Sequence, residues 1–166
     1  MPAPKILVIF YSRSGTTRRV ATALAAKLGG SVEEIVEARG RDGFLGYWRS
    51  IIEARRKSSP EILPAKNDPS SFGLVVIGTP VWAWSVSSPV RAYLTANKGR
   101  LPAVAFFCTL GGKGSETAFG QMQEIVGKPP RATCAITARD VASGGEGALI
   151  AKFAGELQMP ASSIAP

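Results

Sequence analysis

The chain has 166 residues, of which 45% are hydrophobic, enough for one domain, residues 1–166, with a sizeable core. It has no histidine, which excludes Ser-His-Asp and Cys-His catalysis and the common histidine metal sites. The net charge is +8, and residues 1–60 carry 11 of the Lys/Arg but only 5 of the Asp/Glu residues. No aromatic-interleaved basic motif accompanies this charge, so we expect a solvated basic surface and no nucleic-acid partner.

No run of about 18 apolar residues and no signal-peptide pattern is present. We therefore expect a cytoplasmic protein without a membrane partner. Cys108 and Cys134 both fall in apolar runs and are expected to be reduced core residues.

The first predicted strand is the apolar run Ile6–Phe10, and a helix is predicted over 20–28. Between them lies the hydroxyl-rich loop Ser12–Thr17. The first N–H groups of a helix are unpaired and carry a partial positive charge, and Gly15 allows close backbone approach. The loop therefore predicts a phosphate site, the alternative being that Ser14 or Thr16 merely caps the helix. It does not match GxxxxGK[ST], so a nucleoside triphosphate with magnesium is not expected.

The rest of the chain continues the alternation of strands and helices. An edge strand is predicted over Ser31–Ala38, and a helix over Phe44–Lys57 with Tyr47 and Trp48 as core anchors. Further strands are predicted over 74–78, 103–108 and 132–137, and further helices over 89–94, with Ser88 as N-cap, 116–126 and 148–157. Five strands alternating with five helices predict an α/β fold with a parallel sheet covered on both faces.

Three loops are unusual, and all of them follow the carboxyl ends of predicted strands, where ligands of such sheets bind. They are Ser12–Thr17, Thr79–Ser88 and Thr109–Ser115. The second holds Trp82 and Trp84, which either stack on a flat ligand, fold into the core or contact another subunit. The third loop is rich in glycine, and its backbone N–H and C=O groups can hydrogen-bond to the polar edge of a ring. Together the loops suggest a mononucleotide such as FMN.

The segment Ser12-Arg13-Ser14-Gly15-Thr16-Thr17 resembles the phosphate loop of the flavodoxin-like family of FMN-binding proteins. The resemblance spans nearly the whole chain. It implies a three-layer sandwich whose five-stranded parallel sheet has the order 2-1-3-4-5, in a short-chain form. Gly78–Trp82 resembles the quinone-reductase-like branch. The FMN site implied by the resemblance comprises Ser12, Arg13, Ser14, Gly15, Thr16, Thr17, Pro80, Val81, Trp82, Ala83, Trp84, Ser85, Thr109, Leu110, Gly111 and Gly112.

Two features depart from the family. Its electron carriers are strongly acidic, whereas this chain is basic, and Arg18-Arg19 follow the phosphate loop. The charge of these arginines either assists phosphate binding or faces solvent.

The function we expect is that of an FMN-binding redox protein, an NAD(P)H-dependent flavin oxidoreductase of quinone-reductase type with a quinone or similar small acceptor. An electron carrier serving a redox protein partner is the first alternative, and a non-flavin binding or regulatory domain of the same fold is the second. No catalytic acid or base and no metal site can be assigned from the sequence. A monomer and a homodimer are both left open.

Overall fold

The computed structural model describes residues 4–38 and 60–160. The helix predicted over 44–57, with Tyr47 and Trp48, lies outside the described residues.

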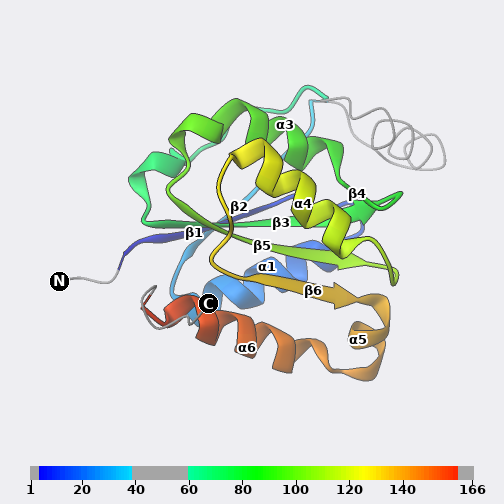
Figure 1. Ribbon diagram of the computed structural model, residues 1–166. Coiled ribbons are helices and arrows are strands. Elements are labelled where there is room, and N and C mark those ends of the chain that lie inside the picture. The colour runs from blue at the N-terminus through cyan, green and yellow to red at the C-terminus, as the bar shows by residue number, and fades with distance from the viewer. Residues whose placement is uncertain (1–3, 39–59, 161–166) are drawn as a thin grey trace.

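The sheet has five parallel strands in the order β2-β1-β3-β5-β6 (Figure 1). They are β1 (Ile6–Phe10), β2 (Ser31–Glu34), β3 (Leu74–Trp82), β5 (Ala103–Leu110) and β6 (Thr133–Thr137). A two-residue strand, β4 (Ser85–Val86), pairs antiparallel with the end of β3. The predicted order 2-1-3-4-5 is thus confirmed for the five parallel strands, and the sixth strand was not predicted.

Helices cover both faces of the sheet (Figure 1). On one face lie α3 (Ser88–Asn97) and α4 (Ser115–Val126), and on the other α1 (Thr16–Leu28) and α6 (Glu146–Gln158). Short 3-10 turns cover Pro69–Ser71 and Lys98–Arg100. None of the helices in the described parts of the chain combines the length and the apolarity needed to cross a membrane.

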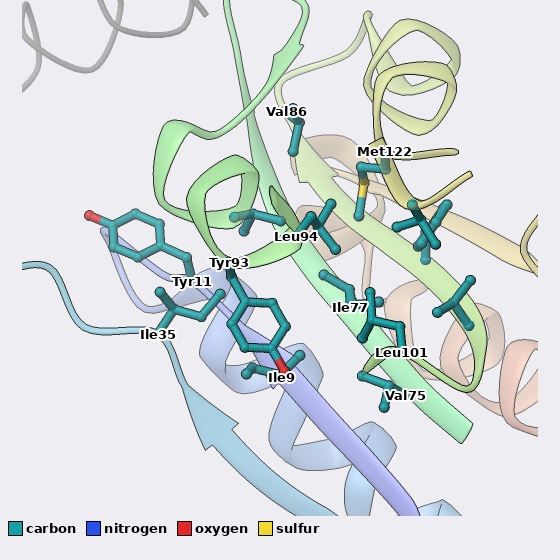
Figure 2. Close-up of a cluster of buried hydrophobic side chains, with 14 of the residues drawn as sticks. Ile9, Tyr11, Ile35, Val75, Ile77, Val86, Tyr93, Leu94, Leu101 and Met122 are labelled. Carbon is teal, nitrogen blue, oxygen red and sulfur yellow. The ribbon is translucent and has the colours of Figure 1, made fainter. Parts of the chain in front are cut away.

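The core consists of two layers because the central strands are buried on both faces. Along β1, Leu7 and Ile9 point toward α3 and α4, and Val8 and Phe10 point toward α1 and α6. Figure 2 shows the first layer, in which Tyr93 of α3 and Met122 of α4 lie over the sheet. This alternation explains why β1 reads as an unbroken apolar run.

Packing leaves no room for a side chain at one point of the second layer. A Cβ built on Gly78 of β3 would lie 2.0 Å from Cζ of Phe107, the neighbouring residue on β5. The aromatic ring of Phe107 therefore occupies the space beside the glycine, which explains the break in the apolar run at residue 78.

Several boundaries differ from the sequence predictions. Strand β2 ends at Glu34 instead of Ala38, because the chain then turns to an antiparallel bridge between Glu37 and Ile62. The N-cap of α3 is Ser87, not Ser88, and Pro89 is the second helical residue. The last helix begins at Glu146.

The helix α5 (Ala138–Ser143) was not predicted. It is stabilised by a capping box in which the Asp140 N–H donates to Thr137 Oγ1 at 3.1 Å and the Thr137 N–H donates to Asp140 Oδ2 at 2.7 Å. The backbone N–H and the hydroxyl of Thr137 lower the pKa of the Asp140 carboxyl. Cys108 and Cys134 are free thiols. Cys108 is buried in the core, as expected, whereas Cys134 is only partly buried and packs against the second layer.

Candidate functional site

The loop after β1 leaves the start of α1 without a side-chain cap. The N-cap is Gly15, whose φ of 100° is in the left-handed region that favours glycine. The Gly15 N–H donates to Ser12 Oγ at 3.0 Å, and the Arg19 N–H donates to the Gly15 carbonyl. The alternative that Ser14 or Thr16 caps the helix is therefore wrong. The first turn of α1 keeps its partial positive charge facing the carboxyl edge of the sheet.

Two of the hydroxyls in this loop have structural partners. Thr17 is buried, and its Oγ1 lies 2.7 Å from Oγ1 of Thr109 at the end of β5. Ser12 is also buried and accepts the bond from Gly15. Ser14 and Thr16 remain as the hydroxyls that line the adjoining cleft.

The two arginines that follow the loop are engaged in ion pairs. Arg18 pairs with Glu34 at 2.6 Å, and Arg19 pairs with Glu146 at 2.7 Å. The hydrogen bonds that Arg18 donates to Glu34 raise the pKa of Arg18. Both guanidinium groups are thus bound to carboxylates outside the cleft.

The predicted loop Thr79–Ser88 is instead a β-hairpin. Strand β3 continues to Trp82, paired with β5 as far as Pro80, and the chain returns as β4 with Val81 opposite Val86. The two-residue turn consists of Ala83, with φ 48°, and Trp84, with φ 61°. Positive φ at both positions is the geometry of tight hairpins, which glycine and asparagine usually occupy. Neither is present here, so the sequence carried no hairpin signal.

Neighbouring side chains hold this hairpin in place. Gln121 of α4 accepts from the Val86 N–H at 2.9 Å and donates through Nε2 to Ser85 Oγ at 3.2 Å. Thr79 Oγ1 accepts from the Ser87 N–H at 3.0 Å. These bonds attach the returning strand β4 and the residue after it to α4 and to Thr79 of β3.

The two tryptophans of the hairpin have different environments. Trp82 is half-buried, packs against the core and meets the ring of Tyr11 edge to face, with centroids 5.5 Å apart. Tyr11 in turn donates a hydrogen bond of 2.6 Å to Glu37 Oε1. Trp84 is 59% exposed and is not part of the cleft lining. Only Trp82 therefore faces the cleft.

The third predicted loop begins later than expected, since Thr109 and Leu110 belong to β5. Its last residue, Gly114, has a φ of 108° and lies against the hairpin. A Cβ at Gly114 would lie 2.8 Å from Trp84 Cα and 3.1 Å from Val81 Cγ1. The second and third loops are thus in direct contact.

A cleft of about 300 Å³ lies at the carboxyl ends of β3, β5 and β6. It brings together eight of the residues predicted from sequence, namely Ser14, Thr16, Pro80, Val81, Trp82, Thr109, Leu110 and Gly111. The end of β6 and helix α5 also line the cleft, which was not predicted. Their lining residues are Ile136, Thr137, Ala138 and Val141. The sequence did contain a sign of α5, because Thr-x-x-Asp at 137–140 has the spacing of a capping box, which marks the start of a helix.

The remaining predicted residues lie around the cleft, outside its lining. They are Ser12, Arg13, Gly15, Thr17, Ala83, Trp84, Ser85 and Gly112. The lining holds no ionisable side chain. It has hydroxyls beside the open start of α1 and apolar or aromatic side chains elsewhere. Within the described residues, no group of three or more His, Cys, Asp or Glu side chains could hold a metal ion.

Comparisons with known proteins agree with this architecture. The flavoprotein of Lactobacillus acidophilus NCFM in complex with FMN matches with a TM-score of 0.71 and 23% identity, over 85% of this chain and 98% of that one. The flavodoxin of Fusobacterium nucleatum bound to flavin mononucleotide matches with a TM-score of 0.57 and 9% identity, over 94% and 98%. A flavodoxin, WrbA-like protein from Agrobacterium tumefaciens gives 0.54 and 12%, over 95% and 100%.

No curated protein sequence matches the chain. The sequence profile of the flavodoxin family, in contrast, matches residues 5–132, which include the first loop, the hairpin and the glycine loop. These residues are well over half of the chain, and the solved structures share its fold. The chain belongs to the flavodoxin family.

Proposed function

We propose that this protein binds FMN non-covalently in the cleft and acts as a redox protein, as an NAD(P)H-dependent flavin oxidoreductase of quinone-reductase type. The observation that carries the proposal is the uncharged cleft, with the uncapped start of α1 at one end and Trp82 in its wall. Two solved structures that share the fold are complexes with FMN, and they support the choice of cofactor.

The residues fit the two chemically different parts of FMN. A phosphate suits the first turn of α1, where unpaired N–H groups, the helix dipole and the hydroxyls of Ser14 and Thr16 favour an anion. A flat ring suits the wall made by Val81, Trp82 and Leu110. Thr109 and Gly111 supply polar groups at the same wall.

The bound flavin would supply the redox chemistry, which needs no protein acid or base. The chain's own residues bind it, orient it and exclude water. Trp82 is braced by Tyr11, so its indole is held at a fixed orientation. Apolar side chains around the cleft disfavour a negative charge on the reduced ring, because they replace water with a medium of low polarity.

The direct test is a titration of the purified protein with FMN, followed by tryptophan fluorescence and by calorimetry. We expect saturable quenching with one site per chain. Trp82→Leu should weaken binding about tenfold, as expected for a lost aromatic contact of roughly 1–1.5 kcal/mol. Trp84→Leu, on the same hairpin but outside the cleft lining, is the matched control and should change affinity far less.

A failure to bind FMN would overturn the redox proposal and leave a binding or regulatory domain of the same fold. Equal losses in the two variants would indicate that the hairpin as a whole, and not the Trp82 ring, carries the binding.

An electron carrier that docks an acidic redox protein is the second candidate. The excess of 20 Lys/Arg over 12 Asp/Glu and the exposed Trp84 beside the cleft favour it. The two candidates differ in their reductant. Rapid bleaching of the bound flavin by NADPH alone supports the oxidoreductase, whereas bleaching only after addition of a separate reductase supports the carrier.

A further inference from the structure

The segment 62–67 crosses the open edge of the sheet beside β2 and is attached at its two ends. At the first end the Leu63 N–H donates to the Val36 carbonyl at 2.8 Å. At the second end Glu33 Oε1 accepts from the N–H of Lys66 at 2.9 Å and from the N–H of Asn67 at 2.9 Å. Between these attachments no hydrogen bond to β2 is seen among the described residues.

Two cavities lie along this segment. One, of about 380 Å³, lies between the segment and β2 and reaches Ile9. The other, of about 490 Å³, lies between the segment and α3 and reaches Arg100. Both volumes are in the range of small-molecule sites. Neither cavity shares a lining residue with the cleft of the proposed flavin site.

Tyr93 of α3 belongs to the walls of both cavities. Its side chain is 1% exposed, and its hydroxyl, which points toward Ile9 in Figure 2, has no hydrogen-bond partner among residues 4–38 and 60–160. Burial, together with the nearby charge of Glu33, raises the pKa of Tyr93, so the phenol remains a neutral donor. A buried hydroxyl without a partner is costly and needs an acceptor.

We propose that the two cavities form a second ligand site, which takes a neutral, mainly apolar molecule with one acceptor oxygen, such as an aromatic ketone, held by the Tyr93 hydroxyl. The inference goes beyond the proposed function and does not depend on flavin binding.

The walls favour this class of ligand over ions. The first cavity is lined mostly by aliphatic side chains, and at its mouth Val32, Val36 and Leu63 are 44%, 49% and 50% exposed. Exposed apolar side chains gathered at a cavity mouth gain by covering. Three of the charged side chains in the walls are already engaged: Glu33 Oε1 accepts three hydrogen bonds, Glu34 pairs with Arg18 at 2.6 Å, and Arg100 pairs with Asp68 at 2.7 Å. An ionic ligand would have to displace one of these partners or to pair with Lys66, which lines both cavities.

The probe we would use is prodan, a neutral naphthalene ketone whose emission shifts to the red when its carbonyl accepts a hydrogen bond. We expect saturable binding of one prodan per chain. Tyr93→Phe should shift the emission of bound prodan to the blue and weaken binding about fivefold, as for one lost hydrogen bond. This variant should fold normally, because the hydroxyl it removes has no partner.

A pair of variants tests where prodan binds. Leu63→Glu places a charge at the mouth and should abolish prodan binding. Met159→Glu changes a side chain of similar exposure, 46%, at the other end of the chain and should leave binding unchanged. Equilibrium dialysis of prodan with saturating FMN should give the same affinity as without it.

The proposal is overturned if prodan does not bind saturably, if FMN displaces it, or if Tyr93→Phe binds with unchanged affinity and emission. Displacement by FMN would place prodan in the cleft of the proposed flavin site. An unchanged Tyr93→Phe would show that the hydroxyl contacts no ligand oxygen.

Discussion

The hydroxyls of Thr17 and Thr109 lie 2.7 Å apart and join the start of α1 to the end of β5. Both side chains are buried. The bond links two segments that are 92 residues apart in sequence and that both border the cleft. Its contribution can be measured.

Thr17→Val should lower the free energy of unfolding by about 1–3 kcal/mol, because it leaves the buried Thr109 hydroxyl unpaired. Thr17→Ser should retain most of the stability. The double variant Thr17→Val/Thr109→Val should cost less than the sum of the two single variants, since neither hydroxyl is then left alone. Urea unfolding of the wild type, the two single valine variants and the double variant measures this coupling, and additive losses would contradict it.

Gly114→Ala should displace the hairpin, because the new methyl group would meet the Trp84 backbone at 2.8 Å. We expect a weaker affinity for FMN, by about tenfold, and a loss of stability above about 1 kcal/mol. Gly127→Ala is the matched control: its φ of 81° brings similar backbone strain, but nothing lies within 4 Å of the added methyl. It should lose stability and keep its FMN affinity, as calorimetry would show.

Gly78→Ala should destabilise the protein by about 1–3 kcal/mol or more, because its methyl group overlaps the Phe107 ring. Phe107→Leu introduced into this variant should restore part of the loss. Gly120→Ala in α4, where nothing lies within 4 Å, should instead be neutral or stabilising, since alanine favours a helix. Thermal unfolding distinguishes these outcomes, and equal stability of the two alanine variants would contradict the packing.

Alkaline pH should destabilise the fold through its thiols. Burial raises the pKa of Cys108 from 9.0 to about 12 and that of Cys134 to about 11. A raised pKa contributes stability that is complete below the unfolded value and is lost as the pH rises toward the folded value. The urea midpoint should therefore fall as the pH rises above about 9, and it should keep falling to about pH 11 through Cys134 and to about pH 12 through Cys108. The fall should be smaller in Cys108→Ala, and an equal fall in both proteins would exclude Cys108 as a source.

Much of the fold could be predicted because strands that are buried on both faces appear in the sequence as unbroken apolar runs. Runs such as Ile6–Phe10 identify the central strands, and their alternation with helices predicts the parallel sheet that the structure shows. The same reasoning placed the hydroxyl loop and the hairpin residues at one edge of the sheet. It also found the side of the cleft that contains Trp82. The order of the strands was implied by the family resemblance.

The features that were missed depend on contacts between distant segments. The Ala83–Trp84 turn has no local signal, since its left-handed backbone is imposed by Gln121, Thr79 and Gly114. Composition could not distinguish Trp82 from Trp84 either. Their different exposure arises because Trp82 is the last residue of β3, whereas Trp84 is in the turn of a hairpin that was not predicted.

The hairpin also has a consequence for the order in which the molecule forms. A turn of two non-glycine residues in the left-handed region costs about 1–2 kcal/mol per residue and does not form stably in isolation. The bonds that stabilise it come partly from α4, which follows it in the chain. The wall of the cleft that carries Trp82 therefore takes its shape only after α4 has packed on the sheet, and a chain interrupted before α4 would have the strands of the cleft without a finished binding surface.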